Sequence, residues 1–318
     1  MHRLGVDLGG TNIACGIVTK EGKILHKTSM PTEGDKPKEH VIENIIKACK
    51  KIMLDNNIPE TEIEYIGLGI PGTCDYDTGS VVLAPNINGF KNLPLRDLIR
   101  EHINLPIYVE NDANCAALAE GTFGAARGYK NSLTITLGTG IGGGFIINSQ
   151  LVKGDTEVGH HIIAQEEWAP MCGCGYRGCF EAHASATALI RDAKEAVENT
   201  YEGSPTSKML ILAGGDLNNI TPKIVFDAAE SGDIPAIDVL NIYLDDLAIG
   251  ITNLTNILPI ELVVIGGGIS KQGDRLLTPL MERLRRKSLG GRPLKVELKI
   301  AMLGNDAGII GAAMLGES

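Results

Sequence analysis

LGVDLGGTNIACGIV, residues 4–18, contains two short apolar runs separated by the turn GGTN. The runs predict two strands joined by a hairpin, and a third strand is predicted to begin at Lys23. The glycines lack the side chains that would keep an anion away from backbone N–H groups, and the Thr11 hydroxyl adds a donor. A plain glycine hairpin has the same pattern, so this motif alone leaves phosphate binding and a simple turn equally open.

A similar stretch occurs in the second half of the chain, NSLTITLGTGIGGGFIINSQLV, residues 131–152. Aligning Asp7 with Thr136 places Gly9 on Gly138, and an apolar run follows the glycines in both copies. Two such openings in one chain indicate a duplicated unit. The repeat favours phosphate binding, because two glycine hairpins could hold the phosphates of one nucleotide.

A dinucleotide-binding oxidoreductase is the rival interpretation of the second hairpin. Gly138, Gly140 and Gly143 formally satisfy the GxGxxG fingerprint. That fingerprint requires a helix immediately after the glycines, whereas the residues that follow predict a strand. A Walker A loop is also absent from the sequence.

The composition restricts the class of protein. A chain of 318 residues exceeds the size at which one core usually stops growing, so we expect two domains. A formal net charge of -10 argues against a basic face for DNA or RNA. The sequence shows no signal peptide, and the uncharged run 131–152 is too rich in polar and glycine residues for a membrane helix. We therefore expect a cytoplasmic protein.

Helical and strand patterns alternate along the chain, which indicates an α/β protein. Strands are predicted at residues 63–70, 106–110, 261–268 and 294–302. Helices are predicted after Pro37, at about 95–102, from Asp112, near 184–198, 221–231, 235–258 and 274–287, and at 306–316.

MCGCGYRGCFEAH, residues 171–183, holds three of the chain's seven cysteines. An odd number of cysteines, four of them single in apolar patterns, argues against a disulfide framework. Zinc sites take four Cys or His ligands, and either His160 or His161 would complete a Cys₃His set. Redox thiols or incidental packing are the alternatives. Four protein ligands leave no open position, so we expect a structural metal bound by Cys172, Cys174 and Cys179 with one histidine.

Four polar residues near these motifs are candidate substrate ligands. Asn111 and Asp112 lie where a strand ends and a helix begins, so capping and catalysis are equally open for Asp112. Glu157 and Glu181 flank the predicted metal ligands and would be held close together by the metal. Alone, each would be a solvated surface charge. Carboxylates held together beside glycine turns suit the hydroxyl groups of a sugar.

At this point the motifs DLGGTN, END, LGTGIGGG, EVGHH and CGCGYRGCFEAH, in this order, resemble the ROK sugar kinases of the actin-like ATPase superfamily. The resemblance covers essentially the whole chain, and the cysteine motif is specific to the family. It implies a two-domain actin-like ATPase (ribonuclease H-like) fold, with a mixed β-sheet flanked by helices in each domain. The implied small domain is 1–115 plus 303–318, and the large domain is 116–302, with a zinc-binding loop at 157–181.

The resemblance also implies a function. The chain would transfer the γ-phosphoryl group of ATP to the 6-hydroxyl of a hexose, glucose first, with Asp112 as general base. Cofactors would be ATP, Mg²⁺ and structural Zn²⁺. Sugar contacts would be Asn86, Asn111, Asp112, Glu157, His160 and Glu181, with His160 also binding zinc. Nucleotide contacts would be Asp7 near Mg²⁺, Gly9, Gly10, Thr11, Asn12, Gly138, Thr139, Gly140 and Gly267.

Several alternatives stay open at the sequence level. The hexose could be fructose, mannose, allose, N-acetylmannosamine or N-acetylglucosamine. The family also includes sugar-responsive repressors, so a non-enzymatic sensor is the second class of function. We do not expect DNA binding, because the first strand begins at once and leaves no room for a helix-turn-helix domain. The resemblance implies a homodimer or homotetramer.

Overall fold

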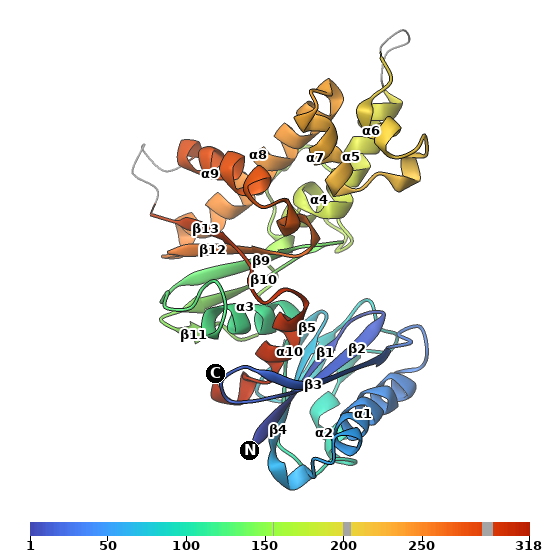
Figure 1. Ribbon diagram of the computed structural model, residues 1–318, viewed down its shortest axis with the longest axis vertical. Helices are drawn as coiled ribbons and strands as arrows, with labels where there is room; N and C mark the ends of the chain where they lie inside the picture. The colour runs from blue at the N-terminus through green and yellow to red at the C-terminus, as the bar shows by residue number, and fades with distance from the viewer. Residues whose placement is uncertain (155, 200–204, 288–294) are drawn as a thin grey trace. The chain divides into compact units, whose positions relative to one another are not determined.

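The computed structural model describes residues 1–154, 156–199, 205–287 and 295–318 (Figure 1). The chain forms two compact units. Unit 1 comprises 1–134, 143–156 and 301–318, and unit 2 comprises 135–142 and 157–300. This division by compactness places residues 116–134 in unit 1, whereas the domain boundaries implied by the family resemblance stay a prediction.

Unit 1 is built on a five-stranded mixed sheet with the strand order β3-β2-β1-β4-β8. The predicted hairpin is present, with Asp7 opposite Ala14 and Leu8 opposite Ile13. Strands β1, β4 and β8 run parallel, and Asp7 pairs with Gly69, which pairs with Glu110. The strands are β1 (His2–Leu8), β2 (Asn12–Val18), β3 (Ile24–Pro31), β4 (Ile63–Ile70) and β8 (Ile107–Asn111).

The alternation of side chains along β1 gives this sheet two different faces. Leu4 and its alternate neighbours are buried in a core shared with helix α1 (Lys38–Asp55), which Figure 1 shows beside the sheet. The opposite face carries Gly5, and helix α10 (Ala307–Ala312) lies on it so closely that a Cβ on Gly5 would be 2.0 Å from the Ile309 carbonyl oxygen. Glycine therefore lets a helix backbone pack directly against a strand.

The second sheet has the strand order β11-β10-β9-β12-β13. This order repeats the first sheet position by position, with the β9–β10 hairpin in the place of the β1–β2 hairpin. The structure thus confirms the duplicated unit that the sequence predicts. The strands are β9 (Ser132–Leu137), β10 (Ile141–Ile147), β11 (Gln150–Leu151), β12 (Leu262–Gly266) and β13 (Glu297–Ile300). Leu294, in the last predicted strand, lies outside the described residues.

Helices make up most of unit 2. The long helix α8 (Ile234–Ile257) packs against several other helices of this unit, and Phe180 packs so closely on it that a Cβ on Gly250 would overlap the Phe180 ring. The helical pattern at 184–198 is interrupted at Ser185, whose hydroxyl accepts the N–H of Ala188 and caps α5. The other helices are α4 (Phe180–Ala184), α5 (Ala186–Glu198), α6 (Lys208–Leu212), α7 (Pro222–Glu230) and α9 (Asp274–Lys287).

A three-stranded antiparallel sheet in unit 1 was not predicted from the sequence. Its strands are short, and the consecutive apolar side chains of Val82 and Leu83 are both exposed. The sequence of these strands therefore lacks a clear alternation of apolar and polar residues. Its strands are β5 (Thr73–Asp75), β6 (Ser80–Leu83) and β7 (Lys91–Leu93), and the nearby helices are α2 (Leu95–Arg100) and α3 (Asp112–Thr122). In the described part of the chain no helix is both long and apolar enough to cross a membrane.

Candidate functional site

The turn of the first glycine hairpin is exposed, and hydrogen bonds at Gly9 fix its backbone. The Gly9 N–H donates to the Asn12 carbonyl at 2.9 Å, and the Thr32 hydroxyl donates to the Gly9 carbonyl at 2.6 Å. Gly10 and Thr11 are exposed. Asn86 is also exposed and lies beside this turn, since its Cβ would be 3.9 Å from a Cβ placed on Gly10. The structure therefore brings together two sequence-predicted elements of the site, Asn86 and the turn.

Asn111 and Asp112 form the corner between β8 and α3. The Asn111 side-chain oxygen accepts the N–H groups of Ala113 and Asn114 at 2.9 and 3.1 Å, so Asn111 is the cap of α3. Its amide nitrogen donates to the Gly72 carbonyl at 2.9 Å. Capping thus belongs to Asn111, and Asp112 is the first helical residue, half-buried, with one carboxylate oxygen accepting the Ala113 N–H at 2.8 Å.

Asp7 and Asp112 lie on either side of Gly69: Asp7 pairs with Gly69 across the sheet, and a Cβ on Gly69 would be 3.5 Å from the Asp112 Cα and 3.1 Å from the buried Cys115 sulfur. Burial chiefly raises the pKa of Cys115, and the charges of Glu110, Asp7 and Asp112 add to that effect. Burial also raises the pKa of Asp7, with Lys27 acting in the opposite direction. Burial disfavours the charged form of the Asp7 carboxylate, so this charge does not stabilise the fold. Carboxylates with a pKa shifted in this way are typical of functional positions.

The second glycine hairpin is held by helices α4 and α5. The Ile141 N–H donates to a Glu181 carboxylate oxygen at 2.9 Å. The Gly138 carbonyl accepts the Ala186 N–H at 2.9 Å, and the Thr139 carbonyl accepts the Thr187 hydroxyl at 2.7 Å. A Cβ on Gly140 would lie 2.2 Å from a Glu181 carboxylate oxygen, so a larger residue there would displace the Glu181 side chain. Glu181 therefore contacts the glycine loop, a contact that sequence spacing did not reveal.

Gly267 lies next to the base of the same hairpin. Its φ of +80° favours glycine, and a Cβ there would be 2.4 Å from the Leu137 carbonyl oxygen. Leu137 immediately precedes Gly138. Gly267, which is predicted to lie near the nucleoside, is therefore next to the predicted phosphate loop.

Four predicted metal ligands converge in unit 2. The ligand atoms of His160 and the three cysteines all lie within 4.8 Å of one another. The Cys172 sulfur is 3.5 Å from His160 Nδ1, and the sulfurs of Cys174 and Cys179 are 3.5 Å apart. Tetrahedral zinc with Zn–S near 2.3 Å and Zn–N near 2.0 Å separates its ligands by roughly 3.5–3.8 Å. The donor set and spacing fit a zinc ion.

The choice between the two adjacent histidines is settled by their surroundings. His160 ends a short 3₁₀ helix, Val158–His160, and turns Nδ1 toward Cys172. His161 Nδ1 instead lies 2.7 Å from the Val158 carbonyl oxygen, and its ring lies 5.1 Å from that of Phe180. Burial lowers the pKa of His161. His161 is therefore a packing residue, and His160 belongs to the cluster of candidate metal ligands.

Burial chiefly raises the pKa of Cys179, to about 12, with the neighbouring thiols of Cys174 and Cys172 adding to it. Burial likewise raises the pKa of Cys172. Crowded thiols that resist ionisation become thiolates when a cation binds them.

The predicted residues thus fall into two groups. Unit 1 holds the Gly9–Asn12 turn with Asn86, and Asp7 with Asn111 and Asp112. Unit 2 holds the Gly138–Gly140 loop with Glu181 and Gly267, and the metal cluster with His160. Glu157 is exposed and directly precedes the 3₁₀ helix that ends at His160.

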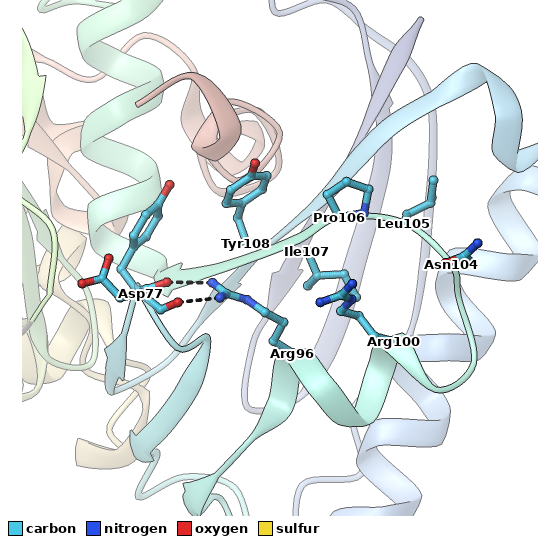
Figure 2. Close-up of a pocket in the computed structure, with 9 residues that line it drawn as sticks. Asp77, Arg96, Arg100, Asn104, Leu105, Pro106, Ile107 and Tyr108 are labelled. Carbon is cyan, nitrogen blue, oxygen red and sulfur yellow. Dashed lines mark hydrogen bonds between the residues drawn. The ribbon is translucent and has the colours of Figure 1, made fainter.

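A cavity of about 500 Å³ in unit 1 contains none of these residues (Figure 2). It lies near the start of β8, where Ile107 and Tyr108 line it, whereas Asn111 and Asp112 lie at or beyond the end of the same strand. Figure 2 shows the Arg96 guanidinium directed at the neighbouring loop, where it donates to the carbonyls of Tyr76 and Asp77 at 2.7 and 2.6 Å. Arg96 fixes that loop, and the cavity is separate from the candidate site.

Comparison with protein families matches residues 3–318 to the ROK family. The chain belongs to the ROK family. It is 40% identical to a glucokinase of Halalkalibacterium halodurans, over 98% of this chain and 94% of that protein. It is 36% identical to a glucokinase of Thermotoga maritima, over 98% and 96%.

Among solved structures, the chain is similar to an ROK glucokinase from Streptomyces griseus crystallised with glucose and AMPPNP. The TM-score is 0.80 and the identity 34%, covering 99% of both chains. The predicted α/β fold of the actin-like type, with two mixed sheets and flanking helices, is confirmed by this likeness together with the strand order.

Proposed function

We propose that this ROK protein is an ATP-dependent hexose kinase that phosphorylates the 6-hydroxyl of glucose. The observation that carries the proposal is the full-length likeness to a glucokinase crystallised with glucose and an ATP analogue. Two glycine hairpins on sheets of the same strand order, and a half-buried carboxylate at the β8–α3 corner, supply groups suited to that reaction.

In this proposal Asp112 accepts the proton of the sugar 6-hydroxyl as the oxygen attacks the γ-phosphorus, and the bond from that phosphorus to the bridging oxygen of ADP breaks. A carboxylate positioned within hydrogen-bond distance of a hydroxyl can act as such a base. The Asn111 side-chain oxygen accepts the cap hydrogen bonds, and one N–H of its amide group donates to the Gly72 carbonyl. The second N–H of that amide group would therefore bind the sugar. Asn111 would thus orient the sugar from a rigid cap.

The two turns would hold the phosphates of ATP through backbone N–H groups, with Gly10 and Thr11 on one turn and Thr139 and Gly140 on the other. Asp7 fits a role near Mg²⁺, because its carboxylate is half-buried and desolvated. A bound Mg²⁺ would neutralise charge on the phosphate oxygens. Gly267 would lie near the nucleoside.

The cluster of His160 and three cysteines would bind one structural Zn²⁺. Its ligands lie beside Glu181, whose second carboxylate oxygen is 3.8 Å from the Cys172 sulfur. Glu157, His160 and Glu181 are proposed to contact the hydroxyl groups of the sugar, and Asn86 to do so from the first turn. Because four protein ligands close the metal site, zinc would hold these residues in place without activating water.

An assay of ADP release with Mg²⁺ and ATP, across glucose, fructose, mannose, allose, N-acetylmannosamine and N-acetylglucosamine, tests the proposal. We expect the highest kcat/KM with glucose. Preference for another sugar would keep the kinase and correct the substrate. Absence of turnover with every sugar, despite sugar binding measured by calorimetry, would overturn the kinase assignment in favour of a sugar sensor.

A further inference from the structure

Glu110 is a fully buried carboxylate directly before Asn111 and Asp112, with a relative exposure of 0%. It is on the face of β8 opposite Val109, whose side chain lies in the hydrophobic core. A buried ionisable group of this kind costs free energy unless hydrogen bonds compensate it. Glu110 is not one of the proposed substrate, nucleotide or metal contacts.

Four donors surround the Glu110 carboxylate. One oxygen accepts the Asn111 N–H at 2.8 Å, the Asn114 side-chain amide at 3.1 Å and the Cys74 thiol at 3.6 Å. The other oxygen lies 3.4 Å from the Gly154 nitrogen, which donates to it. Burial raises the pKa of Glu110, and these bonds lower it. A site with four donors is built for the ionised carboxylate, which only accepts hydrogen bonds.

Asn114 extends this network from the first turn of α3. It is also fully buried, and its amide nitrogen lies 3.3 Å from the Gly154 carbonyl oxygen. Its side-chain oxygen accepts the Thr156 hydroxyl at 3.2 Å. Glu110 and Asn114 therefore bind both Gly154 and Thr156, and Thr156 directly precedes Glu157 in the chain. One buried network thus holds the corner that carries Asp112 and the chain segment that leads to Glu157.

We propose that Glu110 is a positioning residue for phosphoryl transfer: its carboxylate fixes the backbone at Asn111 and Gly154, and it holds Asn114, which binds Thr156, so that the proposed substrate-binding residues next to them are held in place. This inference rests on the proposed kinase function. The contacts of Glu110 distinguish it from a carboxylate that only stabilises the fold. It binds the backbone of Asn111, next to Asp112, and through Asn114 it is linked to Thr156, which precedes Glu157.

The chain provides a matched control in Glu120, near the other end of α3. Glu120 is 1% exposed and accepts the N–H groups of Ala125 and Leu303 at 2.7 and 2.8 Å. It is a buried carboxylate bound to backbone donors, like Glu110, but none of its partners adjoins a proposed substrate contact. The two variants Glu110→Gln and Glu120→Gln therefore make the same chemical change in the two places.

Steady-state kinetics of both variants, well below their melting temperatures, test the inference. Glutamine turns one acceptor into an NH₂ group that must face a donor, so Glu110→Gln should misplace the backbone at Asn111 and Gly154. We expect kcat to fall at least about tenfold and the KM for the hexose to rise, with the KM for MgATP unchanged within about twofold. Glu120→Gln should melt at a lower temperature but keep kcat within about twofold.

Amide hydrogen exchange gives a second measurement that does not depend on activity. Exchange at Asn111 and Gly154 should be faster in Glu110→Gln than in the wild type and unchanged in Glu120→Gln. If Glu110→Gln does not fold, Glu110→Asp keeps the charge with a shorter reach and should show the same kinetic changes in smaller size. Wild-type kcat and hexose KM in either folded Glu110 variant would overturn the inference. A wild-type protein without turnover would instead overturn the kinase function, and this inference with it.

Discussion

Asp112 is the first residue of helix α3, and the neighbouring Asn111 caps that helix, so the proposed role of Asp112 as general base is independent of the cap. Because Asn111 provides the cap, Asp112 can change without loss of the helix start. In Asp112→Asn the side-chain oxygen can still accept the Ala113 N–H. We expect sugar affinity by calorimetry to stay nearly unchanged and kcat to fall at least about a hundredfold, since amides are poor bases.

Asp97→Asn is the control for this experiment, because Asp97 is an exposed carboxylate in the first turn of α2. It should keep wild-type kcat. An Asp112→Asn enzyme within about tenfold of the wild-type kcat would remove Asp112 from the role of general base.

We expect the Asp7 carboxylate, which has a proposed role near Mg²⁺, to lower the stability of the folded protein. Burial raises the pKa of Asp7 from the ordinary value of 3.8. Between pH 3.8 and the raised pKa, Asp7 therefore binds more protons in the native state than in the unfolded state. Stability then decreases as pH rises from below 3.8 through the raised pKa, and levels off above it. Asp7→Asn removes this term. We expect its melting temperature to exceed that of the wild type by a margin that grows over this pH range, with activity lost.

Scanning calorimetry without ligand, between pH 3.5 and 8, measures this margin. The variant Asp35→Asn, at an exposed position, should follow the wild-type curve. A melting temperature for Asp7→Asn below that of the wild type at neutral pH would show that the carboxylate is stabilising and contradict the prediction.

At the scale of elements, helix α4 links the predicted metal ligands to the glycine loop. Cys179 precedes the helix, Glu181 on the helix accepts the Ile141 N–H, and α5 follows with its bond to the Gly138 carbonyl. Metal loss should therefore loosen residues 138–141. We expect Cys174→Ser, at an exposed position, to lower the melting temperature and sugar affinity, and to speed amide exchange in this loop.

Elemental analysis should give about one zinc per wild-type chain. Chelation should reproduce the effects of Cys174→Ser, and added Zn²⁺ should reverse them in the wild type alone. A metal-free protein with full stability and normal exchange at residues 138–141 would contradict the structural role of the metal.

Local sequence patterns predicted most of the helices and strands. They did not predict the contacts between segments that are far apart in the chain. The hairpins and α1 follow from apolar spacing and turn residues within one stretch of chain. The bond from Ile141 to Glu181 joins residues 40 positions apart, and no pattern in either segment signals it. Glu110 was overlooked for a similar reason, because its burial depends on Cys74, Asn114 and Gly154 from three other segments.

At the scale of the whole chain, unit 1 is completed by residues from both ends of the sequence. Arg3 is fully buried and pairs with Glu317 and Glu64. The Tyr65 hydroxyl donates to the Ala313 carbonyl at 2.7 Å. A chain that stops after Ile300 would leave the α10 face of the sheet uncovered and the Arg3 charge without Glu317. We expect such a truncated protein to lose the cooperative unfolding of unit 1.

Limited proteolysis with mass spectrometry should find cleavage within residues 1–134 of the truncated chain and protection in the full one. A synthetic peptide of residues 301–318 should restore part of the protection. A truncated chain as resistant as the full one would show that α10 is dispensable for unit 1.

The position of α10 has a consequence for how the protein is made. Within this sequence strand β1 is translated before the other strands, whereas the helix that covers its glycine face is translated after both sheets. At about 5–20 residues per second, roughly 15 to 60 s separate the two. During that interval the nascent chain exposes an uncovered sheet face, which invites aggregation. We therefore expect the yield of this protein in cells to depend on chaperones that bind the growing chain.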